Sequence, residues 1–262
     1  MFKLSRASIP TAMLGLLLVC GQNLFPLTES AESFDTPLKK SVVDFGPAPD
    51  SLDRGFRVKL SCYFYEGFMV KEYDEGQKGA EWLAIAPFEQ NAAPQCTQSH
   101  TRNETVIKYP EWSGYFKGTR ANWVFFNAAD GENGGLQFVV YDARKGKKVF
   151  EDSAYDSTMW SEKVEDSPFN RLRIEKSQDG QLSLKYLRVV EAECDLHSEK
   201  SACWEAVRKR LGLKNAQVPV CSGYKDIQTR WTSSIAYPVE VFLIPRPAVK
   251  TVPGPTKCWP VD

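Results

Sequence analysis

Alternation of apolar and polar residues with a period of two dominates the chain from about residue 55 onward. In FRVKLSCYF, residues 56–64, every second side chain is apolar or a cysteine. Successive residues of a β-strand face opposite sides of a sheet, so this pattern predicts a half-buried strand. Further strands are predicted over residues 68–73, 82–86, 105–109, 122–127, 136–141, 147–151, 171–176, 182–190 and 239–244.

The segment NWVFFN, residues 122–127, is apolar on both faces, because Trp123 and Phe125 alternate with Val124 and Phe126. That pattern indicates a strand covered on both sides. Turn signals at Gly146 and at Asp179–Gly180 predict hairpins, since these residues tolerate a positive φ. Many short strands joined by such turns predict a mainly β fold, either an antiparallel β-sandwich or an open barrel.

The stretch ADGENGGLQF, residues 129–138, combines acidic residues with glycines and resembles a calcium loop. Counted from Asp130, an EF-hand loop would need a side-chain ligand at Gly134 and a bidentate glutamate at Tyr141, and both requirements fail. The segment also lies between two predicted strands. A glycine-rich hairpin turn is therefore the prediction, and a weak calcium site using Asp130, Glu132 and Asn133 is the alternative.

One short α-helix is predicted near residues 198–212, in SEKSACWEAVRKRLG. Trp204, Val207 and Leu211 fall on one face of it, basic residues occupy its last turns, and Gly212 ends it. Either Ser198 or Ser201 is expected to cap its first turn. The helix is interpreted as an insertion into the β-rich domain.

The first thirty residues differ from the rest of the chain. Lys3 and Arg6 precede a short apolar run over residues 12–21, which is the pattern of a secretory signal peptide. A membrane span needs about 20 apolar residues, and Gln22 ends this run too early. Cleavage is expected after Gly21 or Ser30, and lipid attachment at Cys20 is the less favoured reading. No transmembrane segment is expected after cleavage.

The chain has 7 cysteines, and loss of Cys20 with the leader leaves an even number. Export places thiols in an oxidising compartment, so disulfides are predicted. Proximity along the chain favours the pairs Cys62–Cys96, Cys194–Cys203 and Cys221–Cys258. The alternative is a zinc site formed by Cys194, His197, Cys203 and Cys221, although the spacing lacks the C-x₂-C clips of structural zinc.

Charge and motifs exclude several function classes. The chain has 33 basic and 33 acidic residues, so no strong positive field gathers nucleic acid. Its 2 histidines, His100 and His197, cannot supply an H-E-x-x-H or three-histidine zinc site, and no G-x-S-x-G or P-loop motif occurs. No catalytic residue and no cofactor is predicted. Glu111, beside Trp112, is the nearest candidate for a buried glycosidase carboxyl.

Aromatic residues suggest ligand binding instead of catalysis. Trp112, Tyr115 and Trp123 are the candidate ligand-binding residues, because an exposed ring offers a flat surface to a glycan or an apolar peptide. In a β-sandwich such residues more often belong to the core.

Three segments resemble a group of uncharacterised exported bacterial proteins. They are GYFKGTRANWVFFNAADGENGGLQFVVYDARKGKKVFED (residues 114–152), YPVEVFLIP (residues 237–245) and the closing CWPVD. The resemblance implies export and a β-rich fold, and it carries no activity or site residue.

Together these patterns predict three parts: a signal peptide over residues 1–30, a flexible segment over 31–54, and one β-rich domain over 55–262. We expect a periplasmic or secreted, non-enzymatic binding or envelope-associated module with an unidentified ligand, a glycan or a peptide. A glycan-acting hydrolase with a carboxylate pair and a secreted protease inhibitor are the alternatives.

Overall fold

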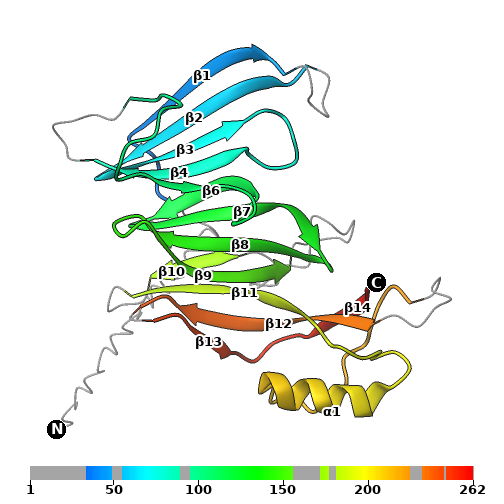
Figure 1. Cartoon of the computed structure of the whole chain (residues 1–262). Helices are drawn as coiled ribbons and strands as arrows, with labels where there is room; N and C mark the ends of the chain where they lie inside the picture. Colours follow the sequence, from blue (N-terminus) through cyan, green and yellow to red (C-terminus); the bar gives the residue numbers. More distant parts are fainter. Residues whose placement is uncertain are drawn as a thin grey trace, which may run out of the picture. The chain divides into compact units, whose positions relative to one another are not determined.

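Antiparallel strand pairing organises the part of the chain that the computed structural model describes (Figure 1). The described residues are 34–48, 55–88, 95–155, 172–176, 181–224, 232–244 and 246–261. The strands are β1 (Lys39–Pro47), β2 (Arg57–Tyr65), β3 (Phe68–Asp74), β4 (Trp82–Pro87), β5 (Thr105–Ile107), β6 (Gly114–Arg120), β7 (Trp123–Glu132), β8 (Gly135–Asp142), β9 (Lys147–Tyr155), β10 (Arg173–Lys176), β11 (Leu182–Glu191), β12 (Thr232–Phe242), β13 (Ala248–Thr251) and β14 (Lys257–Val261), and the helix is α1 (Lys200–Leu211).

The strands form two sheets. The N-terminal sheet has the order β1-β2-β3-β4-β5, and the C-terminal sheet has the order β13-β12-β11-β9-β8-β7-β6, with β10 added to β11 and β14 added to β12. All of these strand pairs are antiparallel. The predicted fold class, a mainly β protein with antiparallel sheets, one helix and disulfides, is confirmed.

The expectation that residues 31–54 are flexible is wrong for 39–47, which form the edge strand β1. This strand pairs along its length with β2, although its side chains are mostly exposed. Its apolar residues, including Val42 and Phe45, do not mark a buried face, so periodicity gave no signal. Backbone hydrogen bonds to β2 hold it in place instead.

A shared core lies between the two sheets. Inward residues of β2 to β5, such as Val70 and Ile85, pack with Val124, Phe126 and Val139 of β7 and β8. The opposite face of the C-terminal sheet carries a second core, which includes Phe125, Phe138 and Tyr186 and the helix residues Trp204 and Val207. The first half of β7 is therefore covered on both sides, as the sequence of residues 122–127 predicts.

The alternation in residues 56–64 marks the outer face of the N-terminal sheet. Leu60 and Cys62 of β2 pack there with Met69 and Ala86, while Tyr63 and Tyr65 face the core between the sheets. The prediction of a strand with only one buried face is corrected for the second half of β2. Its outer face is covered because Cys62 is bonded to Cys96.

A tight turn joins β7 to β8 in the stretch that resembled a calcium loop. Glu132 pairs with Gly135, and the two residues between them, Asn133 and Gly134, have φ values of 51° and 82°. Two positive φ values in a two-residue loop are the signature of a type I′ hairpin turn, for which Asn-Gly is a favoured sequence. The predicted hairpin is confirmed, and so is the one at Gly146, between β8 and β9.

Helix α1 is confirmed, but its predicted cap is wrong. The residue before the helix is Glu199, which makes no side-chain capping bond. Ser198 instead donates its hydroxyl to Asp195, and Ser201 lies within the first turn. At the other end Gly212 adopts the left-handed conformation, as expected.

The three predicted disulfides, Cys62–Cys96, Cys194–Cys203 and Cys221–Cys258, are present. This rules out the zinc alternative, because Cys194 and Cys203 are bonded to each other and Cys221 to a cysteine outside the proposed set. The signal peptide and the Asp179–Gly180 turn lie outside the described residues. Among those described, no helix has the length and apolar character that crossing a membrane would require.

Candidate functional site

A pocket of about 630 Å³ lies at one end of the C-terminal sheet. Several strand connections meet there, namely the β6–β7 and β8–β9 turns, the adjoining ends of β10 and β11, and the segment after β12. Its volume falls in the range typical of small-molecule sites. The lining residues are Asp35, Arg120, Ala121, Asn122, Trp123, Asp142, Arg144, Lys145, Val149, Lys176, Leu182, Leu243, Ile244, Arg246 and Pro247.

Three of these residues form a row across neighbouring strands. Arg120 of β6 is the partner of Trp123 on β7, and Trp123 is the partner of Asp142 on β8. Directly opposed residues of an antiparallel pair point to the same face of the sheet, so the indole lies between a guanidinium and a carboxylate. Trp123 is partly buried against the second core. It supplies an aromatic wall to the pocket.

Positive charge exceeds negative charge in the pocket. Arg120, Arg144, Lys145, Lys176 and Arg246 face two carboxylates, Asp35 and Asp142. Arg120 pairs with Asp35 at 3.0 Å, and Lys145 pairs with Asp142 at 3.2 Å. The other three cations form no ion pair with a described residue. Guanidinium and ammonium groups in this state attract anions, and arginine can bind carboxylate or phosphate with two parallel hydrogen bonds.

The other two candidate ligand-binding residues are not brought to this pocket. Trp112 is buried in the core between the sheets, with only 8% of its surface exposed. Tyr115 is partly buried, and its hydroxyl accepts a hydrogen bond from the Gly79 N–H at 3.0 Å. Both residues pack in the core between the sheets, and of the three candidates Trp123 is the one that lines this pocket.

Each residue of the weak calcium candidate has one oxygen atom engaged in another contact. Asp130 forms an ion pair with Lys78, and Glu132 accepts a hydrogen bond from the Gln137 amide at 3.1 Å. The backbone carbonyl of Asn133 accepts a hydrogen bond from the Trp259 indole N–H at 3.0 Å. Among the described residues, no group of three or more histidine, cysteine or acidic side chains is placed to hold a metal ion.

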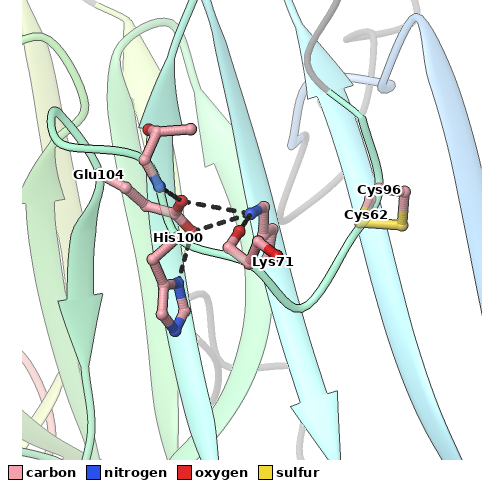
Figure 2. Close-up of polar contacts among 7 residues, drawn as sticks. Cys62, Lys71, Cys96, His100 and Glu104 are labelled. Atoms are coloured by element: carbon pink, nitrogen blue, oxygen red, sulfur yellow. Dashed lines mark hydrogen bonds and ion pairs between the residues drawn. A yellow bond between two sulfur atoms is a disulfide. The ribbon is translucent and has the colours of Figure 1, made fainter.

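A buried ion pair lies beneath residues 95–104 on the outer face of the N-terminal sheet (Figure 2). The Lys71 ammonium lies 3.1 Å from Glu104 Oε1 and donates to the Ser99 carbonyl at 2.9 Å. The Lys71 side chain is 2% exposed and that of Glu104 0%. Glu104 also accepts a hydrogen bond from the Thr101 N–H at 2.9 Å. Every charged group of this cluster therefore has a partner.

His100 lies at the surface end of this cluster. Its Nδ1 is 3.1 Å from Glu104 Oε1, and its ring meets Trp82 edge-on at 4.7 Å. Figure 2 shows the other ring nitrogen directed away from the cluster. A carboxylate on one histidine nitrogen orients the other toward a reacting group in many enzymes. Here the contacts of His100 with Glu104 and Trp82 attach residues 95–104 to the sheet, which indicates a structural role.

Burial and hydrogen bonding act in opposite directions on Glu104. Burial raises the pKa of its carboxyl, but hydrogen bonds from Thr101, His100 and Lys71 and the Lys71 charge outweigh it, leaving the pKa below its ordinary value. Glu104 is therefore held in its charged form.

Glu111, the candidate glycosidase carboxyl, is exposed at the surface. It accepts a hydrogen bond from the Tyr141 hydroxyl at 2.8 Å. Burial, followed by this contact, raises the pKa of Tyr141. The buried environment that a glycosidase acid needs is found around the tyrosine and not around Glu111.

Comparison with protein-family models, with curated proteins and with solved structures finds no match to this chain in any of the three. The site is therefore interpreted from its own geometry. Sequence reasoning identified Trp123 but missed its charged neighbours. The only signal for them is that Arg120, Arg144 and Lys145 lie at the ends of predicted strands, where turns gather at one edge of a sheet.

Proposed function

We propose that the protein is an exported, non-enzymatic binding module. Its ligand is a small anion with a ring or another flat apolar body, held in the pocket at Trp123. The observation that carries this proposal is the excess of cations around an aromatic side chain in a cavity of ligand size. A ring would pack on the indole and the apolar residues Val149 and Leu182, while the negative group meets the cations that line the pocket.

Export is supported by the covalent framework. Three disulfides join the described cysteines, and disulfides persist mainly in oxidising compartments. The leader-like pattern over residues 1–30 is consistent with the same compartment. We place the protein in the periplasm or outside the cell.

Binding without catalysis is preferred to the hydrolase alternative. The carboxylates of the pocket, Asp35 and Asp142, are both engaged in ion pairs with its own cations. A glycosidase instead needs one carboxylate free to act as a base or nucleophile and one carboxyl group that can donate a proton.

The proposal is tested by calorimetric titration with two ring-bearing carboxylates, glucuronate and benzoate. Glucose and benzamide, which keep the ring but lack the charge, are the matched ligands. Saturable binding is expected for at least one carboxylate and not for its uncharged counterpart. Saturation by neither carboxylate contradicts the proposal, as does equal binding of the charged and uncharged partners.

Two variants locate the site. Trp123→Ala and Arg246→Ala are each expected to weaken binding by about tenfold, which corresponds to loss of one aromatic contact or one charge-assisted hydrogen bond. Tyr109→Ala and Arg102→Ala remove the same kinds of group at exposed positions outside the pocket. Unchanged affinity in the first pair, or equal losses in both pairs, would place the ligand elsewhere.

A further inference from the structure

The carboxylate of Asp35 lies in the pocket in the way that a bound carboxylate ligand would. Its Oδ1 accepts a hydrogen bond from Arg120 Nη1 at 3.0 Å, and its Oδ2 accepts one from the Ala121 N–H at 2.5 Å. A guanidinium and a backbone N–H directed at the two oxygens of one carboxylate form a carboxylate receptor. The receptor is next to the candidate aromatic wall, because Arg120 is the strand partner of Trp123.

The geometry of the β6–β7 turn creates this receptor. Ala121 has a φ of 52°, in the left-handed region that residues other than glycine seldom adopt. Its N–H donates to Asp35 instead of to another strand residue. Residues other than glycine that adopt this conformation are often found at functional sites, where the surrounding structure holds them in it.

Asp35 belongs to the segment that precedes β1 and lies outside the two sheets. Its N–H donates to the Thr119 carbonyl at 2.7 Å. The neighbouring Phe34 ring meets Phe125 at 5.5 Å and lies where a side chain at Gly118 would be, since a Cβ there would approach the ring to 2.4 Å. The backbone of residues 34–35 is therefore anchored independently of the Asp35 carboxylate.

The ion pair itself remains open to exchange. The Asp35 and Arg120 side chains are 36% and 30% exposed, and a partly exposed ion pair contributes little to stability. A ligand carboxylate that replaces Asp35 would regain the same two hydrogen bonds. Displacement would require only a rotation of the partly exposed Asp35 side chain, since the contacts of Phe34 do not involve that carboxylate.

We propose that Asp35 is an internal competitor that determines the affinity of the pocket for carboxylates, occupying the Arg120–Ala121 receptor until a ligand carboxylate displaces it. This inference rests on the proposed function, because it concerns the same pocket. It assigns Arg120 as the residue that recognises the ligand carboxylate and Asp35 as the residue that limits the affinity for it. The ligand class is thereby narrowed to ring-bearing carboxylates.

The test compares glucuronate and benzoate binding in the wild type and in Asp35→Asn. Asparagine keeps an acceptor for the Ala121 N–H but removes the competing charge, so the affinity for the carboxylate that binds is expected to rise by about tenfold. Asp44→Asn is the matched control, because it makes the same change in net charge at an exposed ion pair on β1. It is expected to leave affinity unchanged.

A second variant distinguishes competition from a general gain in charge. Adding Arg120→Gln to Asp35→Asn removes the receptor and is expected to abolish the gain, which a double-mutant cycle measures directly. Thermal melting of each variant verifies that it is folded. Binding by the wild type without a gain in Asp35→Asn, or a gain that survives Arg120→Gln, overturns the inference but leaves the proposed function intact. Absence of carboxylate binding in every variant overturns both.

Discussion

Two single residues, Lys71 and Glu104, fix residues 95–104 on the N-terminal sheet. Lys71 occupies a position on β3 directly opposite Cys62 on β2, so the ion pair and the Cys62–Cys96 disulfide attach the covering segment at neighbouring points (Figure 2). Desolvating two charges costs free energy that their attraction must offset. We interpret the pair as a device that positions this segment and not as a large net source of stability.

Replacing one partner of this pair is expected to be strongly destabilising. Lys71→Met leaves the Glu104 carboxylate buried without its cation, so the free energy of unfolding should fall by about 3–5 kcal/mol. Urea denaturation measures the change. In the double variant Lys71→Met/Glu104→Leu no unpaired charge remains, and its loss should be smaller than that of Lys71→Met alone. A double variant that loses as much stability as Lys71→Met, or more, would contradict this account.

The same carboxyl predicts a pH dependence. The pKa of Glu104 is lowered in the folded state, so the unfolded chain binds a proton more readily. The stabilisation is fully present above the unfolded pKa of about 4.3 and is lost as pH falls through the lower folded pKa. Stability measured by urea denaturation between pH 7 and pH 3 should therefore fall less steeply in Glu104→Gln than in the wild type. Parallel stability curves for the two proteins would show that Glu104 does not contribute to the loss of stability in acid.

The β7–β8 hairpin shows at the scale of elements how a turn sequence also serves packing. The type I′ turn needs a positive φ at Gly134, and the Trp259 indole of β14 lies against the same glycine. A Cβ at Gly134 would approach Trp259 Nε1 to 2.6 Å. The turn therefore fixes β14, which is distant in sequence, as well as its own two strands.

Gly134→Ala should combine backbone strain with this steric conflict. We expect a loss of roughly 2–5 kcal/mol in the free energy of unfolding. Gly67→Ala is the matched control, because Gly67 has the same φ of 82° but a Cβ added there would have no neighbouring atom within 4 Å. Its loss should be about 1–2 kcal/mol, from strain alone. Chemical denaturation of both variants separates the two effects. Equal losses in the free energy of unfolding would show that Trp259 moves aside without destabilising the fold.

The central strands could be predicted from sequence because their periodicity reflects burial. Strands β7 and β8 are apolar on both faces and β2 alternates strongly, so their patterns were clear. Strands β1 and β13 were missed because they are edge strands with mostly exposed side chains. Strand β6 was missed because glycines and polar residues interrupt its pattern.

The pocket could not be predicted for a different reason. Its lining comes from segments between residues 35 and 247 that meet only after both halves of the sheet have paired. Trp123 was identifiable as an aromatic at a strand end. Asp35 was not, because it lies in a segment without any periodic pattern. Strand registers, which a single sequence does not specify, decide which charges surround the indole.

Disulfides constrain the molecule as a whole and differ in the chain length that they enclose. Cys62–Cys96 spans 34 residues and Cys194–Cys203 spans 9. Loop-closure entropy predicts stabilisation of about 4 and about 3 kcal/mol respectively. Replacing both cysteines of a disulfide with serine should therefore lower the free energy of unfolding more for Cys62–Cys96 than for Cys194–Cys203. Urea denaturation measures both losses. The opposite order would show that native packing, and not chain entropy, dominates.

The expected compartment makes a separate prediction for the native product. Mass spectrometry of the protein from its own cells should show a chain that begins after Gly21 or Ser30 and has no free thiol among its remaining cysteines. An uncleaved chain with reduced cysteines would contradict export.

The central claim is that a ring-bearing anion binds against Trp123. It is tested most directly by following the tryptophan indole N–H resonances in an NMR titration with glucuronate or benzoate. The chain has 7 tryptophans, and Trp112 and Trp204 are buried away from the pocket. We predict a saturable shift of the Trp123 resonance, with those of Trp112 and Trp204 unchanged. A titration that leaves Trp123 unmoved, or that shifts the buried indoles equally, would contradict the account.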